Sequence, residues 1–426
     1  MTMSMGAVLG LSFIVLFVLS VPLPFSIALS SFIALWVGNK PFTLIAQRMF
    51  MGTDSFPMLA IPFFVLSGEI MLKGGLSRRL IQVANTLIGH LTGGLATVTV
   101  ASAAFFGAIS GSAPATTASI GAIMVPEMRE NGYDADFSAA LVASVGPLGQ
   151  VIPPSIPMVL WATMASVSVS NLFLAGFLPG LLMSVALIVC CYIISRRKQY
   201  GVKGRRATLR EIFLAFKDGI WALLMPVIIL GTIYGGVCTP TEAGGIVCLY
   251  AILVGLFIYR ELHLKDLPAI LFATVKTTAM VVFMVACANL FGWIMASEQL
   301  PAKMVNAFLS ISSNKYVLLF LMNIALLIVG ALMDNISGMT ILCTVLTGIG
   351  SSLGINPIHL GAIVVINFAI GNITPPVGYT LYVASSISDM PFERIAKNAL
   401  PMLAAEIFVL MIITYIPFFT LAFIGG

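Results

Sequence analysis

Charged side chains are scarce in this sequence: Asp, Glu, Lys and Arg make up 9% of its 426 residues, against roughly 25% in soluble domains. Hydrophobic residues make up 59%. This balance excludes a soluble globular protein, a disordered chain and a nucleic-acid-binding protein. The apolar runs are continuous and long enough for spanning helices of about 20 residues, whereas a β-barrel would alternate polar and apolar residues. The sequence therefore predicts an all-α polytopic membrane protein that lies in a lipid bilayer.

Motifs of catalysis and nucleotide hydrolysis are also lacking. No H-E-x-x-H, Walker A loop or G-x-G-x-x-G occurs in the chain. Gly350-Ser-Ser-Leu-Gly354 matches G-x-S-x-G in letters only, because it follows no predicted strand and has no acid and histidine partner in reach. The three histidines are far apart and the six cysteines form no C-x-x-C pair, which argues against a His/Cys metal site. An intramembrane enzyme is therefore disfavoured, and an ion gradient is the expected source of energy.

Positive charge is concentrated in one segment. Eight of the 21 basic residues lie between Arg196 and Lys217. Because Lys and Arg in short loops mark the cytoplasmic side of a membrane protein, residues 195–220 are predicted to form a cytoplasmic connector; a patch for anionic lipids is the alternative. With five full crossings expected on each side of this connector, both termini are predicted to be periplasmic.

The apolar runs predict a series of helices separated by polar or proline-containing breaks. Residues 41–53 are too short to span a membrane and are expected to form a helix that lies in the interface, and residues 76–90 are expected to form an amphipathic segment. The longer helices are expected at 5–20, 24–38, 57–73, 171–194, 221–237, 243–259, 269–296 and 392–420. Glu69 and Glu242 are expected to have structural roles, Glu242 as part of a helix N-cap with Thr239.

Each half of the chain also contains a pair of short apolar helices and a helix interrupted by prolines. In the first half, residues 93–128 predict a re-entrant hairpin with a small polar tip at 110–114, and residues 135–165 predict a helix broken at 146–154. In the second half, the corresponding hairpin is 316–351 with its tip at 333–337. The corresponding broken helix is 357–387, interrupted at 371–378.

These matching features indicate an internal repeat. A shift of 222 residues places Gly149 on Gly371 and the first Pro-Pro pair on the second, with eight identities over 149–181, where apolar composition alone gives roughly three. The predicted domains are repeat 1 at 1–194, the connector at 195–220 and repeat 2 at 221–426. Because the charge pattern places the two copies in opposite orientations, they are expected to be inverted repeats, which together with broken helices are typical of secondary transporters.

The tips and breaks are the predicted ion sites. Unwound backbone in a membrane is tolerated only where it is buried in protein or lines a cavity, and free carbonyls with hydroxyl or carboxylate oxygens suit a hard cation such as Na⁺. At least two Na⁺ ions are proposed. The first site would use Ser110, Ser112 and carbonyls of Gly149 to Val151; the second would use Asp334, Asn335 and the loop from Gly371 to Thr374. The alternative for Asp334 is that it merely ends a helix.

Helix N-termini that resume after the breaks are predicted to bind the substrate. Their N–H groups near Ser155 and Val377 are expected to be free, and free N–H groups at a helix start suit a carboxylate. The candidate substrate-binding residues lie around these two helix starts and the two tips: Thr117, Pro154, Ser155, Asn335, Pro376 and Val377.

Five ordered segments carry a resemblance to a known family. They are Asp54-Ser-Phe-Pro-Met-Leu-Ala-Ile-Pro-Phe-Phe, Ser110-Gly-Ser-Ala-Pro-Ala, Ile152-Pro-Pro-Ser, Thr239-Pro-Thr-Glu-Ala and Ile373-Thr-Pro-Pro-Val-Gly. Across essentially its whole length, the chain resembles the large, DctM-like membrane subunit of TRAP transporters (tripartite ATP-independent periplasmic transporters). The resemblance implies a bacterial inner-membrane protein that imports a carboxylate with Na⁺ by an elevator mechanism. It also implies two partners: a periplasmic substrate-binding protein and a small four-helix membrane subunit, expected here as a separate chain.

One motif departs from the usual family pattern. Many members carry an Asp a few residues after the Ser-Gly-Ser tip, whereas this chain has Ala115-Thr-Thr-Ala118. The Ala-Pro-Ala-Thr-Thr form most resembles sialic-acid members, with C4-dicarboxylates and other sugar acids as alternatives. A stand-alone sodium/dicarboxylate symporter of the same inverted-hairpin plan is the alternative transporter.

Overall fold

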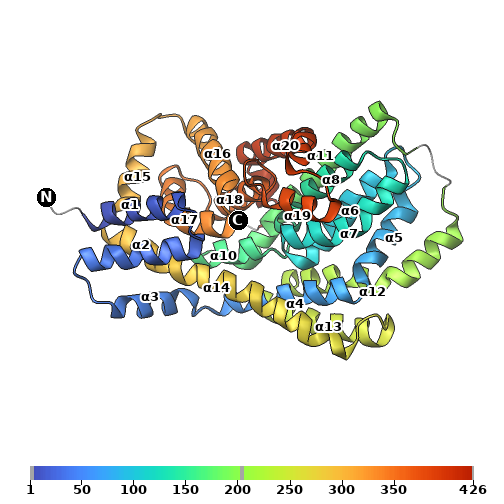
Figure 1. Cartoon of the computed structure of the whole chain (residues 1–426), viewed down its shortest axis with the longest axis horizontal. Coiled ribbons are helices and arrows are strands. Elements are labelled where there is room, and N and C mark those ends of the chain that lie inside the picture. Colours follow the sequence, from blue (N-terminus) through green and yellow to red (C-terminus); the bar gives the residue numbers. More distant parts are fainter. Residues whose placement is uncertain (1–3, 202–205, 425–426) are drawn as a thin grey trace.

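Every regular element of the protein is a helix in the residues that the computed structural model describes, 4–201 and 206–424 (Figure 1). Within these residues, seven helical segments are long and apolar enough to cross a membrane, and one bent pair adds an eighth. The predicted all-α polytopic fold is therefore confirmed. Two residues of the basic segment, Lys203 and Arg205, lie outside the described residues, as do the last two glycines.

The first half of the chain follows the predicted order of helices closely. The chain begins with one helix and then the two helices of residues 23–53. A short 3₁₀ turn, a spanning helix, an amphipathic helix, a hairpin and a broken helix follow. Their bounds are α1 Met5–Val18, α2 Leu23–Val37, α3 Thr43–Thr53, η1 Phe56–Leu59, α4 Ala60–Lys73, α5 Leu76–Ile88, α6 Gly94–Ser110, α7 Ala113–Glu130, α8 Ala135–Val145, α9 Leu148–Val151, α10 Ile156–Met164 and α11 Val169–Lys198.

The second half has the same kinds of elements, with three differences from the prediction. Its bounds are α12 Leu209–Tyr234, α13 Pro240–Leu253, the π-helical turn η2 Val254–Ile258, η3 Leu264–Asp266, α14 Leu267–Ser297, α15 Leu300–Leu309, α16 Lys315–Leu332, α17 Asn335–Ser352, α18 Pro357–Gly371, α19 Tyr379–Ser388, α20 Phe392–Tyr415 and α21 Phe418–Leu421. The division of the chain into inverted repeats stays a prediction.

The differences have local causes. Helix α12 begins a dozen residues before the expected 221 because Thr208 and Glu211 form a capping box, each side chain accepting from the other residue's backbone N–H. Helix α15 was not predicted, although Pro301 in its first turn favours a helix start. The expected helix 392–420 ends at Tyr415, where Ile416 leaves the helical conformation before Pro417 and α21 follows.

A capping box also explains the role of Glu242, one of the two glutamates for which a structural role is predicted. At the start of α13, the Thr239 N–H and hydroxyl both donate to the Glu242 carboxylate at 2.8 Å, and the Glu242 N–H donates back to the Thr239 hydroxyl. The carboxylate satisfies two donors that would otherwise lack an intrahelical partner. The structural role predicted for Glu242 is therefore confirmed.

Helices from the two halves are interleaved rather than separated. The long helix α14 packs against α2, α3 and α4, which come from the first half, and runs along one edge of the molecule in Figure 1. In the same way α4 packs against α13 and α5 against α12. In Figure 1 these helices form a layer along one side of the hairpins and the broken helices.

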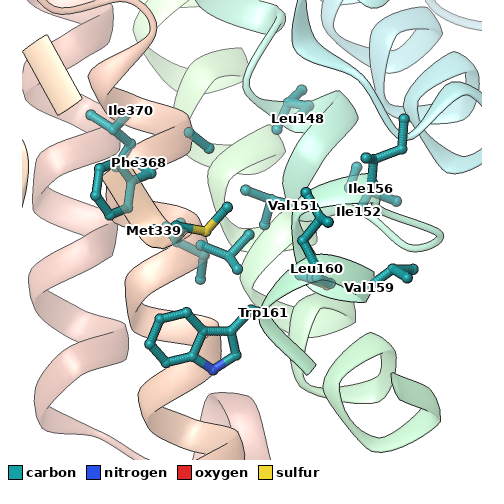
Figure 2. Close-up of a cluster of buried hydrophobic side chains, with 14 of the residues drawn as sticks. Leu148, Val151, Ile152, Ile156, Val159, Leu160, Trp161, Met339, Phe368 and Ile370 are labelled. Carbon is teal, nitrogen blue, oxygen red and sulfur yellow. The ribbon is translucent and has the colours of Figure 1, made fainter. Parts of the chain in front are cut away.

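The two broken helices meet in the buried centre of the molecule. Figure 2 shows Leu148, Val151 and Trp161 of the first broken helix facing Met339 of α17 and Phe368 of α18 across one apolar cluster, and all five side chains are fully buried. Because lipid is itself apolar, close packing of these side chains, and not their removal from water, stabilises the contact between the two broken helices. This cluster therefore holds the two breaks at a fixed separation.

Candidate ion and substrate site

The tip of the first hairpin gathers three hydroxyl-bearing residues. Helix α6 ends at Ser110, Gly111 adopts a left-handed φ of +63°, and Ser112 caps α7. The Ser110 Oγ lies 3.1 Å from the Thr116 Oγ1, which donates to the Ser112 carbonyl at 2.9 Å. The tip therefore places the Thr116 hydroxyl within hydrogen-bonding distance of both the Ser110 hydroxyl and the Ser112 carbonyl oxygen.

The first break lies directly against this tip. A Cβ placed on Gly149 of α9 would stand 2.2 Å from the Thr116 Oγ1 and 2.8 Å from the Ser112 carbonyl oxygen, so only a glycine fits there. The Ile156 N–H, just after the Pro-Pro pair, donates to the Gly111 carbonyl at 3.2 Å. The structure therefore brings together Ser112 and Gly149 of the predicted first site, with Ser110 joined to them through Thr116.

Thr116 was missed by the sequence analysis. Its side chain is fully buried and lies between Ser110 and Gly149. The signal that could have found it is its spacing: Ser112 and Thr116 are four residues apart at the start of a helix, and such residues lie on one face.

The other predicted residues of the first break contact different neighbours, and only some of them contact the tip. The Val151 carbonyl lies against Gly176 of α11, where a Cβ would stand 2.5 Å from it. The Ser155 hydroxyl donates to the Gln150 carbonyl at 2.5 Å and accepts from the Met158 N–H. The Pro154 carbonyl oxygen would stand 3.0 Å from a Cβ on Gly111, so Pro154 touches the tip.

Thr117 is the predicted substrate-binding residue with the least satisfied side chain. It is fully buried, and its hydroxyl has no hydrogen-bond partner among the described residues. The hydroxyl lies against the first break, 2.3 Å from where a Cβ of Gly146 would stand, and Thr380 of α19 approaches the same point. A buried hydroxyl without a partner is costly, and the role of Thr117 in substrate binding stays a prediction.

The tip of the second hairpin centres on Asp334, which caps α17. Its Oδ2 accepts from the Ser337 N–H at 3.0 Å and its Oδ1 accepts from the Ser337 hydroxyl. The capping role that was the alternative for Asp334 is therefore present, and its role in cation binding stays a prediction. Asn335 is buried, and its Nδ2 has no partner among the described residues.

The second break meets its hairpin in the same manner as the first. A Cβ on Gly371 would stand 2.7 Å from the Gly330 Cα of α16, and in the first half a Cβ on Gly107 would stand 2.7 Å from the Gly149 Cα. The Val377 N–H donates to the Ala331 carbonyl at 3.1 Å. In both halves, therefore, a backbone N–H after the Pro-Pro pair binds a carbonyl near the hairpin tip.

This arrangement corrects one expectation. The N–H groups near Ser155 and Val377 were expected to be free, but those of Ile156 and Val377 are hydrogen-bonded to the tips. The reason is that the tips approach the breaks closely enough for the main chains to pair, which the sequence could not show. A substrate carboxylate would have to use other donors or displace these bonds.

Two backbone carbonyls at the second break accept hydrogen bonds from Thr374 of the same loop. The Thr374 hydroxyl donates to the Ile370 carbonyl at 2.9 Å and the Thr374 N–H donates to the Gly371 carbonyl at 3.0 Å. Pro375, Pro376 and Val377 are exposed, as is Asp334, whereas residues 141–160 around the first break are all buried. Ser112 of the first tip is itself half-buried, so the two predicted cation sites differ in degree: the second is more exposed than the first.

Two buried polar features lie outside the predicted set. The Asn372 Nδ2 donates to the Gln150 Oε1 at 2.8 Å, which joins the two breaks directly. Glu406, in the middle of α20, is fully buried, and neither carboxylate oxygen has a hydrogen-bond partner in the described part of the chain. The described residues also contain no group of three or more His, Cys, Asp or Glu side chains placed to hold a metal.

Two solved membrane proteins share this fold. The structure is similar to the YdaH transporter of Alcanivorax borkumensis, with a TM-score of 0.61 at 15% identity over 88% of this chain and 87% of that one. It is also similar to MtrF of Neisseria gonorrhoeae, with a TM-score of 0.58 at 13% identity over 90% of this chain and 84% of that one. Identity this low identifies the shared fold alone.

Sequence comparison identifies the family. The family described as "Tripartite ATP-independent periplasmic transporter, DctM component" matches residues 11–419, and this chain belongs to it. The predicted resemblance is therefore confirmed.

Named relatives are similar over most of the chain. It is 42% identical to the C4-dicarboxylate TRAP transporter large permease protein DctM of Pseudomonas aeruginosa, over 89% of this chain and 88% of that protein. It is 40% identical to the sialic acid TRAP transporter large permease protein SiaM of Vibrio cholerae, over 88% of each. It is 39% identical to the isethionate TRAP transporter permease protein DctMQ of Oleidesulfovibrio alaskensis, over 97% of this chain but 65% of that protein's length. These relatives are named as permeases and not as enzymes.

Proposed function

We propose that this chain is the large membrane subunit of a Na⁺-coupled, binding-protein-dependent importer of a carboxylate. The observation that carries the proposal is the pairing of each hairpin tip with a broken helix, through a glycine contact and a backbone hydrogen bond in each half. Family membership supports the uptake function. Relatives are named for C4-dicarboxylates, sialic acid and 2,3-diketo-L-gulonate, which are carboxylates, and one is named for isethionate, which is a sulfonate. Sialic acid is the first substrate to test, followed by C4-dicarboxylates and other sugar acids.

The two cation sites follow from the oxygen atoms that the tips and breaks present. The first would hold Na⁺ with Ser110, Ser112 and the Gly149 carbonyl, with Thr116 as an added hydroxyl. The second would hold Na⁺ with Asp334, Asn335, Gly371 and Thr374, where the carboxylate supplies a negative charge. Hard cations prefer such oxygen ligands, and ions held at broken helices in the membrane are a recurrent feature of secondary transporters.

The moving part would be the group that contains both hairpins and both broken helices. We propose that it slides as an elevator against the layer of helices that includes α2, α4, α13 and α14, and that the two halves are inverted repeats with 195–220 in the cytoplasm and both termini in the periplasm. The unequal exposure of the two sites supports alternating access, because one conformation of an inverted repeat opens one half and closes the other.

Two partner proteins are proposed. A periplasmic binding protein would deliver the carboxylate, and a small four-helix membrane subunit, as a separate chain, would complete the transporter in the bacterial inner membrane. Family membership supports both partners.

The test is reconstitution with one component left out at a time. Proteoliposomes that contain this chain, the small subunit and the binding protein should take up one member of a labelled carboxylate panel, and omission of either partner should abolish uptake. Uptake by this chain alone would instead favour the stand-alone symporter. A binding protein that delivers no carboxylate of the panel would contradict the proposed substrate class.

A further inference from the structure

A buried hydrogen bond joins the two breaks at equivalent positions. The Asn372 Nδ2 donates to the Gln150 Oε1 at 2.8 Å, and the two residues are 222 positions apart. This is the same shift that places Gly149 on Gly371 and one Pro-Pro pair on the other. When two halves of a chain are related by a twofold axis, a residue that touches its own counterpart lies on that axis. The bridge therefore marks the point where the two breaks meet.

Both amides are removed from solvent. Gln150 is 5% exposed and Asn372 is 4% exposed. A buried amide that loses its hydrogen-bond partner still carries the free-energy cost of its desolvation. Each amide is therefore stable in this position only while the other break is also in place.

The bridge is connected to both proposed cation sites through the main chain. Gln150 follows Gly149, and its own carbonyl accepts from the Ser155 hydroxyl at 2.5 Å. Asn372 follows Gly371, and its carbonyl accepts from the Thr380 N–H at 3.0 Å and from the Thr380 hydroxyl at 2.9 Å. A change in either break that reorients the glycine carbonyl beside it also moves the bridging side chain.

We propose that the Gln150–Asn372 bridge couples the two cation sites, so that ordering of one break by Na⁺ favours ordering of the other. This inference rests on the proposed function, because it needs cations at both breaks. Both residues act as positioning residues: they set the main chain next to the ligands and do not touch the ion. Coupling between two sites is measured as a change in the affinity of one when the other is filled, typically 5-fold or more.

The experiment compares the Na⁺ dependence of uptake in the complete reconstituted system. The unmodified protein should show a sigmoidal dependence with a Hill coefficient above 1. Gln150→Asn shortens the bridge by one methylene and Asn372→Gln lengthens it by one. Each single variant should lower the Hill coefficient toward 1 and raise the Na⁺ concentration for half-maximal uptake by about 5-fold. The double exchange Q150N/N372Q restores the combined length and should restore cooperativity.

A second double variant separates coupling from folding. Gln150→Met with Asn372→Leu replaces both amides by apolar groups of similar shape, a change that is often nearly neutral for stability. We expect this variant to fold, to bind Na⁺ and to have lost cooperativity, measured both by uptake and by the Na⁺ dependence of its thermal unfolding. The matched control is Asn367→Ser, which removes another buried amide bond, to Asn323 within the second half, and should leave the Hill coefficient unchanged.

The outcomes separate this inference from the proposed function. Cooperative uptake in the unmodified protein with the same Hill coefficient in Q150M/N372L would overturn the coupling role and leave the proposed function intact. Failure of Q150N/N372Q to restore cooperativity that both single variants have lost would also overturn it. Uptake that does not depend on Na⁺ in the unmodified protein would contradict the proposed function and the inference together.

Discussion

The contact between Gly371 and Gly330 gives a direct test of how the second break meets its hairpin. A methyl group on Gly371 would stand 2.7 Å from the Gly330 Cα, 2.8 Å from its carbonyl carbon and 2.9 Å from its oxygen. Ordinary contacts begin at 3.4 Å, so Gly371→Ala requires the two backbones to separate by about 0.7 Å, the difference between 3.4 and 2.7 Å. Because these atoms belong to the main chains of α16 and α18, no side-chain rotation relieves the overlap.

Overpacking of this kind costs about 1–3 kcal/mol. We therefore expect Gly371→Ala to lower uptake by roughly 5- to 150-fold if the close approach is part of the transporting conformation, since 1.4 kcal/mol is tenfold. The assay is the initial rate of uptake in proteoliposomes, with the thermal midpoint of the purified protein measured in parallel.

Gly292→Ala in α14 is the matched control. It is also a glycine inside a helix, but no atom lies within 4 Å of its added Cβ. Alanine stabilises a helix relative to glycine by about 1 kcal/mol, so this variant should be at least as stable as the unmodified protein and equally active. If Gly371→Ala behaves like Gly292→Ala in both assays, the proposed docking of hairpin and break is refuted.

Four further predictions concern single side chains. Gly149→Ala should impair uptake at least as strongly as Gly371→Ala, because its methyl group would meet the Ser112 carbonyl oxygen at 2.8 Å as well as the Thr116 hydroxyl; wild-type rates would contradict the first tip. Asp334→Asn should reduce Na⁺-dependent uptake without loss of folded protein, since Asn caps helices as well as Asp; an unchanged Na⁺ dependence would remove Asp334 from the site. Glu406→Gln should retain both folded protein and uptake, because neither oxygen of the buried carboxyl has a partner in the described residues, whereas a loss of uptake with intact folding would assign Glu406 a role in transport. The Lys198 ammonium donates to the Asp134 carboxylate at 2.6 Å and lowers the pKa of that carboxyl. The ion pair therefore stabilises the fold at pH values above the ordinary carboxyl pKa of about 4, and this stabilisation is lost as the pH falls through the lowered pKa. Asp134→Asn should lower the free energy of unfolding by about 0.2–1 kcal/mol at pH 7 in chemical denaturation, and an equal loss at pH 3 would contradict the ion pair.

The helices and breaks could be predicted because they depend on local sequence. A Pro-Pro pair interrupts a helix wherever it occurs, and the polar tips at 110–114 and 333–337 stand out between apolar runs. Helix α15 was not predicted because it is short and only two residues separate it from the end of α14. The sequence shows the end of the apolar run of α14 but no separate apolar run for a second helix.

The contacts between segments could not be predicted, because they depend on packing across hundreds of residues. Nothing in the local sequence shows that Val377 donates to Ala331, and the expected free N–H group was wrong for that reason. The Gln150–Asn372 bridge had one usable signal: both residues follow a glycine at the same shift of 222. A repeat with a twofold axis requires some equivalent residues to meet at the axis, and buried amides beside the breaks are suitable candidates.

The measurement that tests the central claim most directly is uptake driven by different cation gradients. Proteoliposomes with this chain, the small subunit and the binding protein, loaded with the cognate carboxylate, would be given an inward gradient of either Na⁺ or K⁺ at equal ionic strength. We predict accumulation of the carboxylate with the Na⁺ gradient and none with K⁺. Equal accumulation with both cations, or accumulation with neither while ATP drives it, would contradict the account.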